Sequence, residues 1–482
     1  MPPAPAATAA SFFWHDYETF GRVPRRDRPA QFAGLRTDAA LNEIGEPVVH
    51  YCRPAPDFLP DPQACLLTGI LPQHCLQQGV PEQAFALAIE AELGAPGTIG
   101  VGYNSIRFDD EVTRFLFWRN LIDPYAREWQ NGCSRWDLMD ALRCAWALRP
   151  EGLVWPKHDD GRPSFKLEHL SAANGVAHES AHDALSDVRA TLGLARLLKA
   201  RQPRLWDFCL KLRDKNAVRD EIGVDRPFVH VSGRYPAERG CLALVWPLAP
   251  HPVNRNEVIV WDLAQDPRQL QGLDADALRE RLFTRESDLP EGVQRLPIKT
   301  IHLNKSPIVV SGAGMMKAAA TRWGIDLEAV QRHAGYAKAI APELLPRWAA
   351  VFGRQAAPGG VDVDEDLYGG FIGDEDRRTL QRLRGLAPAA LAERHPAFGD
   401  PRLAELLFRY RARNYPDTLS ADEHAQWQRH CAARLHEGAG GAFTLARYFE
   451  AIDALAEDAD ERQQALLEAL YDYGEAIAPE DS

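Results

Sequence analysis

Hydrophobic and polar residues follow three successive patterns along the chain. Residues 11–201 alternate short strand-like hydrophobic runs with longer segments whose hydrophobic positions recur at helical spacing. Residues 202–353 contain short β-rich runs broken by Pro, Gly and Asn, and nearly every segment of residues 359–482 has helical spacing. The patterns therefore predict an α/β domain, a small antiparallel β-barrel and an all-helical domain, in that order.

Individual runs carry this prediction. Strands are expected at FFWHDYETF, EPVVHYCRP and GTIGVGYNS, and helices at DDEVTRFLFWRNL, RWDLMDALRCAWAL and HDALSDVRATLGLARLLKA. The barrel is expected from FVHVSG, CLALVWPLA, NEVIVWDL and PIKTIHLNKSPIVVS. RQPRLWDF is interpreted as a hinge, AAPGGVDVDED as a linker, and residues 1–10 as a disordered lead-in.

Composition narrows the class of protein. The 482 residues carry a net charge of -13, which argues against a general binder of polyanions. A phosphate-binding surface would therefore need a local cluster of basic residues. The eight scattered cysteines include no Cys-x-x-Cys pair, so we do not expect a zinc ribbon. We expect instead that the cysteines are reduced thiols in a cytoplasmic protein. No stretch is long and apolar enough to span a bilayer.

Two acids interrupt the first aromatic run. Asp16 and Glu18 are two residues apart in a predicted strand, so their side chains share one face. Two neighbouring negative charges favour a cation between them, and hard oxygen ligands suit Mg²⁺ or Mn²⁺. The alternative is a strand end with two solvated acids.

Two later stretches add further acids. Asp109 and Asp110 follow a glycine-rich strand at the start of a helix. Asp110 is expected to be a helix cap or a first-turn acid, whereas Asp109 can either cap the helix or bind metal. Asp187 lies beside the hydrophobic stripe of its helix, and His182 precedes that helix on a loop. Taken singly, each has a structural alternative as a cap or a surface acid.

The three stretches form the ordered set D-x-E, N-x-x-x-F-D and H-D-A-x-x-D. This set resembles the DEDD exonuclease superfamily in its histidine-bearing branch. Longer runs, among them HDYETFG, VGYNSIRFDDEVTR, SRWDLMDALRCAWALRPEG and FRYRARNYP, look like bacterial exonuclease I from about Ser11 to near the C-terminus.

The resemblance implies a fold and an activity. The fold is an α/β ribonuclease-H-like exonuclease domain (11–201), an SH3-like barrel domain (202–353) and a C-terminal helical domain (359–482). The activity is processive removal of 5′-mononucleotides from the 3′ end of single-stranded DNA, in DNA repair and recombination. Two Mg²⁺ ions per site, replaceable by Mn²⁺, would drive phosphodiester hydrolysis.

The resemblance also implies roles for the five motif residues. Asp16 would bridge both ions, and Glu18, which also contacts substrate, would complete with Asp187 the site that activates water. Asp109 would support the second ion, which stabilises the leaving oxygen. His182 would be the general base, and the ordinary imidazole pKa of about 6.5 suits that task near neutral pH.

Substrate contacts follow from the same resemblance. Arg114, Tyr125, Trp129 and Arg143 match family positions that contact single-stranded DNA, and Lys166 stands where arginine is expected. Apart from the resemblance, His302, Asn304 and Lys305 in IHLNKSP are interpreted as side chains that carry DNA across the barrel domain. Lysine keeps the charge at that position but lacks the bidentate fork. Core packing is the alternative for Tyr125 and Trp129. The cluster Arg22, Arg25, Arg26 and Arg28 is interpreted as a phosphate contact or a solvated face, and YGGF after Asp366 as an approach to the strand.

A protein partner is implied as well. The family binds the acidic, hydrophobic tail of single-stranded DNA-binding protein; Arg149 matches a basic position used there, while Lys317 and Phe208 replace an expected arginine and tyrosine. We expect a cytoplasmic monomer with no membrane contact.

Two rival functions stay open. An RNA-trimming or proofreading exonuclease would use the same catalytic set, but such proteins are much shorter, and the two extra domains favour the DNA enzyme. A non-catalytic DNA-binding adaptor on a decayed nuclease fold is the other rival. The presence of all five expected catalytic residues argues against decay.

Overall fold

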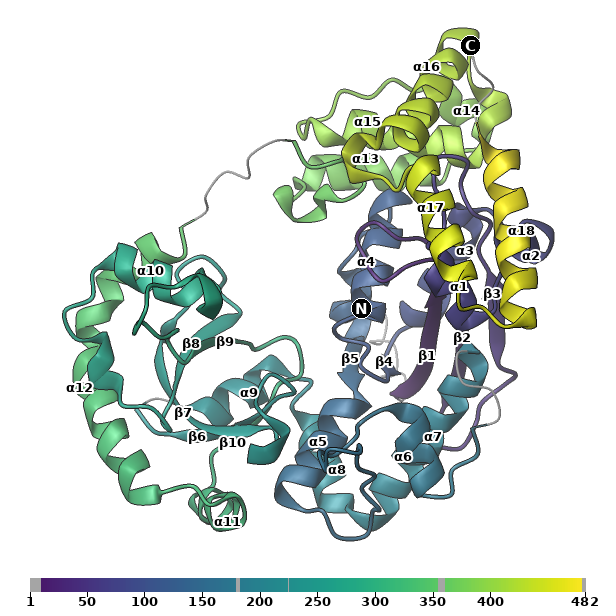
Figure 1. Cartoon of the computed structure of the whole chain (residues 1–482). Coiled ribbons are helices and arrows are strands. Elements are labelled where there is room, and N and C mark those ends of the chain that lie inside the picture. Colours follow the sequence, from purple (N-terminus) through teal and green to yellow (C-terminus); the bar gives the residue numbers. More distant parts are fainter. Residues whose placement is uncertain (1–9, 179–182, 224, 354–359, 479–482) are drawn as a thin grey trace, which may run out of the picture. The chain divides into compact units, whose positions relative to one another are not determined.

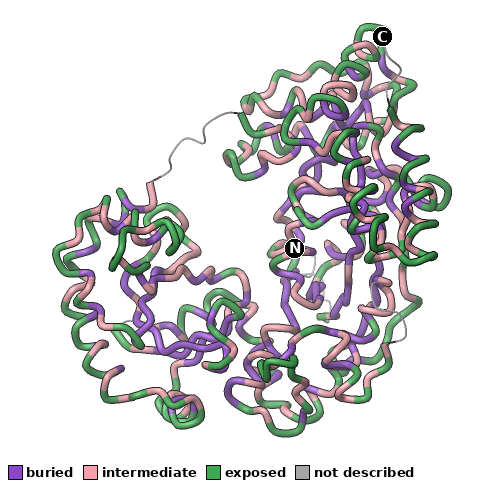
Figure 2. Tube along the Cα trace, in the orientation of Figure 1, coloured by how far each residue is buried: buried purple, intermediate pink, exposed green. Residues whose placement is uncertain are grey.

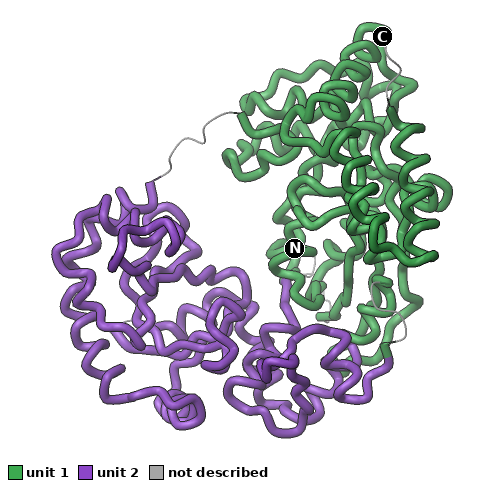
Figure 3. Tube along the Cα trace, in the orientation of Figure 1, with its two compact units in different colours: residues 1–134, 178–190, 357–482 green, residues 135–177, 191–356 purple. Residues whose placement is uncertain are grey.

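The computed structural model describes residues 10–178, 183–223, 225–353 and 360–478 (Figure 1). The chain divides into two compact units (Figure 3). Unit 1 comprises residues 1–134, 178–190 and 357–482, and unit 2 comprises residues 135–177 and 191–356. The expected lead-in falls outside the described residues except for Ala10. No helix among the described residues has both the length and the apolar character needed to cross a membrane.

A mixed five-stranded sheet, in the order β3-β2-β1-β4-β5, forms the framework of the exonuclease-like part. Strand β1 pairs antiparallel with β2 and parallel with β4. The boundary between the units crosses β5 and helix α7. The strands are β1 (Ser11–Thr19), β2 (Pro29–Thr37), β3 (Val48–Tyr51), β4 (Thr98–Gly102) and β5 (Ser134–Asp137).

Helices of unit 1 cover this sheet and continue into the C-terminal part (Figure 1). Shared hydrophobic cores join the two parts: one contains Phe115 and Trp118 with Leu403 and Tyr410, and another joins Phe58 to Tyr448. The helices are α1 (Pro62–Thr68), α2 (Pro72–Gln78), α3 (Glu82–Leu93), α4 (Asp109–Arg119), α13 (Asp374–Arg384), α14 (Pro388–Ala392), α15 (Arg402–Asn414), α16 (Ala421–Ala432), α17 (Leu445–Ala456) and α18 (Glu461–Ile477).

Unit 2 contains an antiparallel five-stranded sheet in the order β10-β6-β7-β8-β9. Most residues of its strands are buried (Figure 2). The strands are β6 (Phe228–Val231), β7 (Leu242–Pro250), β8 (Glu257–Asp262), β9 (Ile298–His302) and β10 (Ile308–Val310). The helices are α5 (Leu138–Leu148), α6 (Leu167–Ala173), α8 (Pro203–Lys211), α9 (Lys215–Ile222), α10 (Ala275–Phe283), α11 (Ala313–Trp323), α12 (Leu327–Val351) and the end of α7 (Ala184–Arg201).

The structure corrects three sequence expectations. Strand β2 was not expected, because burial on both faces removes the alternation that marks a half-exposed strand. The expected hinge 201–208 is mostly helix α8, since Pro203 occupies the first helical position, where proline initiates a helix. Residues 202–353 also hold long helices, among them α12, which has two internal prolines.

Candidate metal centre

Three carboxylates converge in unit 1. Asp16 and Glu18 come from β1, and Asp187 comes from the first turn of α7. One ligand oxygen from each lies within 4.8 Å of the other two, a spacing that a single metal ion could bridge. The prediction that Asp16 and Glu18 share a face is thus confirmed, and the structure brings Asp187 to them.

The site is strongly electronegative. Burial raises the pKa of Asp16 well above its usual range, and the charges of Asp109, Glu18, Asp187 and Asp183 raise it further. Burial, followed by the charges of Asp187, Asp109 and Asp183, raises the pKa of Glu18 to about 9. A divalent cation would relieve this repulsion, and three hard oxygen ligands fit Mg²⁺ or Mn²⁺. The residues present therefore suit the metal that the motif implies.

Asp109 opens helix α4 next to this cluster. Its side chain is buried, and its Oδ1 accepts a hydrogen bond of 3.1 Å from the backbone N–H of Tyr17, in the strand that carries Asp16. The Thr113 hydroxyl lies 2.8 Å from the Asp109 carbonyl oxygen, to which it can donate, and 3.0 Å from the Tyr17 hydroxyl. Asp109 is therefore fixed against β1, although it is not one of the three carboxylates within 4.8 Å.

The neighbouring Asp110 has a structural task. It is a first-turn acid of α4, as expected, but the N-cap residue is Phe108. Its buried carboxylate pairs with Arg127 at 2.6 Å. This ion pair ties the start of α4 to the segment that carries Trp129.

The expected general base, His182, lies outside the described residues. A different histidine contacts the cluster: Nε2 of His178 lies 2.5 Å from Oδ1 of Asp187. Sequence reasoning missed His178, and its only signal was a second histidine four residues before His182.

The expected DNA contacts of unit 1 differ in exposure. Arg114 is buried and paired at 2.7 Å with both Glu111 and Glu128, and its guanidinium lies 5.2 Å from the centre of the Tyr125 ring. Trp129 is 67% exposed, so the core-packing alternative is wrong for it. Tyr125 is partly buried against the core around Trp118, which supports that alternative for Tyr125.

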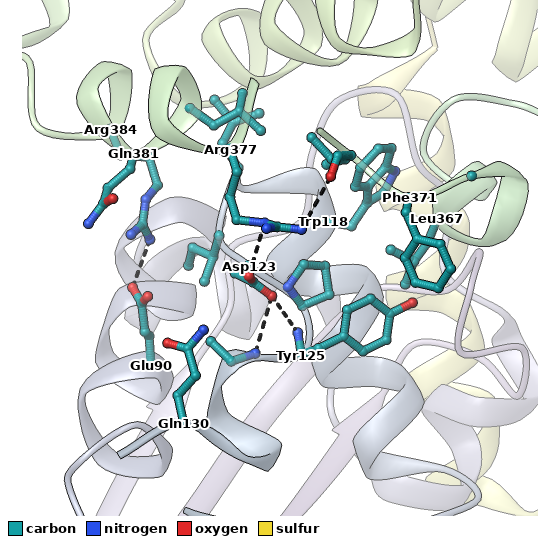
Figure 4. Close-up of a pocket in the computed structure, with 17 residues that line it drawn as sticks. Glu90, Trp118, Asp123, Tyr125, Gln130, Leu367, Phe371, Arg377, Gln381 and Arg384 are labelled. Carbon is teal, nitrogen blue, oxygen red and sulfur yellow. Dashed lines mark hydrogen bonds and ion pairs between the residues drawn. The ribbon is translucent and has the colours of Figure 1, made fainter. Parts of the chain in front are cut away.

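Tyr125 also lines a cavity of about 230 Å³ (Figure 4). Its wall includes Trp118 and residues of the YGGF region, notably Phe371, which is 90% exposed. Ion pairs at the cavity link Arg377 to Asp123 at 3.5 Å and Arg384 to Glu90 at 2.8 Å. Two stretches singled out separately in the sequence thus meet at one cavity.

The expected contacts of unit 2 occupy several elements. Arg143 on α5 pairs with Asp140 at 2.7 Å, and its guanidinium lies 5.6 Å from the centre of the Phe165 ring. Lys166, just before α6, has a side chain that is 60% exposed. His302 ends β9, 3.2 Å from Glu257, and Asn304 and Lys305 follow in the next turn.

The arginine cluster after β1 is largely bound to acids. Arg25 and Arg26 each lie 3.0 Å from Glu365. Arg28 is buried and contacts Asp364 at 3.2 Å, with Glu82 at 3.4 Å. The expectation of a phosphate contact or a solvated face is therefore wrong for Arg28, because a buried guanidinium between two carboxylates faces neither phosphate nor solvent.

The expected partner-tail residues lie in unit 2. Arg149, which follows α5, is exposed and its Nη2 is 3.3 Å from the Met315 sulfur in α11. Lys317 on the same helix is also exposed, whereas Phe208 on α8 is partly buried. The Trp323 indole N–H donates to the carbonyl of Ala147 at 2.9 Å, which fixes α11 against α5.

Family models match three successive parts of the chain. They are "Exonuclease" at residues 13–195, "Exonuclease I SH3-like domain" at 213–354 and "Exonuclease I C-terminal domain" at 361–477. Their order confirms the predicted fold class of an α/β exonuclease domain, an SH3-like domain and a helical C-terminal domain.

Relatives and solved structures match over nearly the full length of the chain. Exodeoxyribonuclease I of Escherichia coli (strain K12) is 44% identical over 477 residues, covering 97% of this chain and 98% of the relative. The structure of an exonuclease I from Methylocaldum szegediense superposes with a TM-score of 0.92 at 48% identity, covering 97% of this chain and 99% of that one.

Two further structures contain bound molecules. A zinc-bound complex of E. coli ExoI with ssDNA has a TM-score of 0.90 at 43% identity, covering 97% of this chain and 99% of that one. An ExoI/SSB-Ct complex has a TM-score of 0.89 at 43% identity, covering 98% of this chain and 100% of that one.

Proposed function

The chain belongs to the exonuclease I family, and on that premise we propose that it degrades single-stranded DNA processively from the 3′ end to 5′-mononucleotides. The observation that carries the proposal is the convergence of Asp16, Glu18 and Asp187, whose ligand oxygens lie within 4.8 Å of one another. Such a cluster is costly for a merely structural protein, because burial and mutual repulsion both oppose its ionisation.

Two Mg²⁺ ions, replaceable by Mn²⁺, are proposed to bind to Asp16, Glu18, Asp109 and Asp187. When bound, such ions supply an activated water and stabilise charge on the leaving 3′-oxygen. The protein's part is to hold the carboxylates on β1, α4 and α7, with Glu18 also contacting the substrate. His182 is proposed to accept the proton of the attacking water.

Single-stranded DNA is proposed to bind through side chains of both units. Trp129 is the strongest candidate, because its exposed indole can stack on a base, a contact worth roughly 1–3 kcal/mol. Arg114 already pairs with two carboxylates, so its proposed part is to hold Tyr125 in place at the DNA. The other proposed contacts are Lys166, Arg143, His302 and Lys305.

A partner is proposed from the exposed cations beside α11. Arg149 and Lys317 would bind the acidic tail of single-stranded DNA-binding protein, with Phe208 supplying apolar contact. The enzyme is proposed to act as a cytoplasmic monomer in DNA repair and recombination.

The test is a time course on 5′-labelled single-stranded DNA with Mg²⁺, run beside matched RNA, blunt duplex DNA and an EDTA control. We expect full-length DNA to pass directly to very short products, with RNA and duplex spared. Asp16→Asn should abolish this loss, while Asp159→Asn, the same change at an exposed position, should not. If the DNA stays intact both with Mg²⁺ and with EDTA, the result would favour the non-catalytic adaptor. Preferential loss of RNA would favour an RNA-trimming exonuclease.

A further inference from the structure

A row of three side chains crosses the sheet beside the metal centre. Strand pairing places Gln31 of β2 directly opposite Glu18 of β1 and also opposite Tyr51 of β3. Residues directly opposite on neighbouring strands project from the same face of a sheet. Gln31 therefore lies between a metal-ligand carboxylate and a tyrosine, and it is only 2% exposed.

The Gln31 amide uses its oxygen and its nitrogen to hold the start of helix α7. Its Oε1 accepts a hydrogen bond of 3.2 Å from the backbone N–H of Ala184. Its Nε2 donates to Oδ1 of Asp183 at 3.3 Å and to the Tyr51 hydroxyl at 3.0 Å. A carboxamide supplies one acceptor oxygen and two N–H donors, so glutamine matches all three partners. Glutamate lacks the donors, and methionine lacks both functions.

The turn held in this way carries Asp187. The Asp187 backbone N–H donates to the Asp183 carbonyl at 3.0 Å. Oδ2 of Asp183 caps the same turn by accepting from the Ser186 N–H at 3.1 Å. Fixing Asp183 and Ala184 to β2 therefore fixes the backbone from which Asp187 reaches toward β1.

Electrostatic repulsion opposes this arrangement before an ion binds. When Asp16 and Glu18 ionise to receive an ion, their negative charges repel those of Asp183 and Asp187 at the start of α7. A neutral amide can bind the helix start without adding another negative charge. Gln31 is thus suited to keep the ligands close together while no ion holds them.

We propose that Gln31 is a positioning residue of the metal centre, which holds Asp187 near Asp16 and Glu18 and so raises the affinity for a divalent ion. This inference rests on the proposed function, because it assumes that the three carboxylates bind metal. Loss of a group that orients metal ligands typically costs about 10–100-fold in metal affinity.

The test measures Mn²⁺ binding to the full chain without DNA, by calorimetry. Gln31→Met should weaken binding about 10–100-fold. Tyr51→Phe is the matched control: it removes one bond to the same amide but leaves those to Asp183 and Ala184, so affinity should fall less than about threefold. Gln31→Glu should lose more than Gln31→Met, because it places a carboxylate against Asp183.

Kinetics separate positioning from general damage. Gln31→Met should lower kcat on single-stranded DNA at limiting Mn²⁺, leave KM for DNA nearly unchanged, and recover activity when Mn²⁺ is raised. A merely structural defect would not be rescued by metal. Circular dichroism and urea unfolding in EDTA confirm that each variant is folded. If Gln31→Met does not fold, Gln31→Asn, which keeps the amide but shortens its reach, decides by the same measurements.

The outcomes distinguish this inference from the proposed function. Unchanged Mn²⁺ affinity in a folded Gln31 variant would overturn the inference and leave the nuclease proposal intact. Absence of Mn²⁺ binding by the unsubstituted chain would overturn both. Weaker binding by Gln31→Met, with Tyr51→Phe nearly normal, supports the inference.

Discussion

Unit 1 contains two clusters of buried or half-buried carboxylates with opposite electrostatics. The first is the metal centre around Asp16, Glu18 and Asp187. The second, here called the arginine network, joins the exonuclease-like part to the C-terminal helices through buried ion pairs. Its members are Arg28, Asp57, Glu82, Arg119, Asp362, Asp364, Arg409, Arg413 and Arg434.

Burial acts in the same direction in both clusters, but the neighbours differ. In the arginine network burial would raise the pKa of Asp57 and Asp364, yet Arg413, 2.6 Å from Asp57 and 2.5 Å from Asp364, helps to lower both well below their usual range. In the metal centre burial and neighbouring acids both raise the pKa of Asp16 and Glu18. In the arginine network the chain's own arginines neutralise the carboxylates. In the metal centre a bound cation would neutralise them.

The largest expected effect comes from removing one charge at the metal centre. Asp16→Asn should reduce nuclease activity by roughly 10³-fold or more, since a bound metal contributes several kcal/mol to transition-state stabilisation. The same change should increase the free energy of unfolding in EDTA by about 1–3 kcal/mol, because it relieves repulsion. Single-turnover cleavage and urea titration measure the two effects. A destabilised Asp16→Asn protein would contradict this account of the metal centre.

Removing one charge from the arginine network should have the opposite effect on stability. Asp364→Asn leaves Arg413, Arg28 and Arg409 without a shared counter-charge, and breaking a buried pair costs about 3–5 kcal/mol. Urea unfolding in EDTA, beside Asp16→Asn, gives the direct comparison. Asp376→Asn is a useful control, because that buried acid accepts backbone N–H bonds from Gly399 and Asp400 instead of binding the network. If Asp364→Asn and Asp376→Asn both lowered the free energy of unfolding by the same small amount, the result would argue against a special role for the arginine network.

A divalent ion should act on one cluster only. A ligand present at 100 times its Kd stabilises the folded state by about 2.7 kcal/mol. Mg²⁺ or Mn²⁺ at that excess should therefore raise the unfolding midpoint of the unsubstituted chain. The Asp364→Asn variant should show the same increase in unfolding midpoint when the ion is added, although its midpoint without the ion is lower. The Asp16→Asn variant should show no such increase. Stabilisation of Asp16→Asn by the same ion would place the metal elsewhere.

The sequence predicted the metal centre better than the arginine network, for a physical reason. Asp16 and Glu18 are local in the chain, so strand periodicity alone places them on one face. The partner of Arg28 is Asp364, 336 residues away, and charge patterning within a short segment gives no sign of such a pair. The cluster after β1 was accordingly interpreted as a phosphate contact or a solvated face.

Gln31 was missed for a related reason. Its partner Ala184 is 153 residues away, and the contact depends on the register between β1, β2 and β3. Strand β2 itself was hidden by burial on both faces. The order of the three domains follows from the resemblance to a known family, whereas the side-chain contacts between distant segments follow only from the folded structure.

The two clusters should also differ in the pH dependence of unfolding when no metal is bound. The pKa of Glu18 is about 9 in the folded chain against 4.5 normally, so between these values the folded state holds a proton that the unfolded state has released. The free energy of unfolding should therefore fall as pH rises from about 4.5 to about 9, by up to about 1.4 kcal/mol per pH unit. Asp364 has a lowered pKa, so its contribution is present above its normal value of 3.8 and is lost as pH falls below it. Urea unfolding in EDTA from below pH 3.8 to about pH 9 should show that Glu18→Gln reduces the alkaline slope, to which Asp16 also contributes, and that Asp364→Asn flattens the acid slope. An alkaline slope that is unchanged in Glu18→Gln would mean that Glu18 does not hold an excess proton in the folded state.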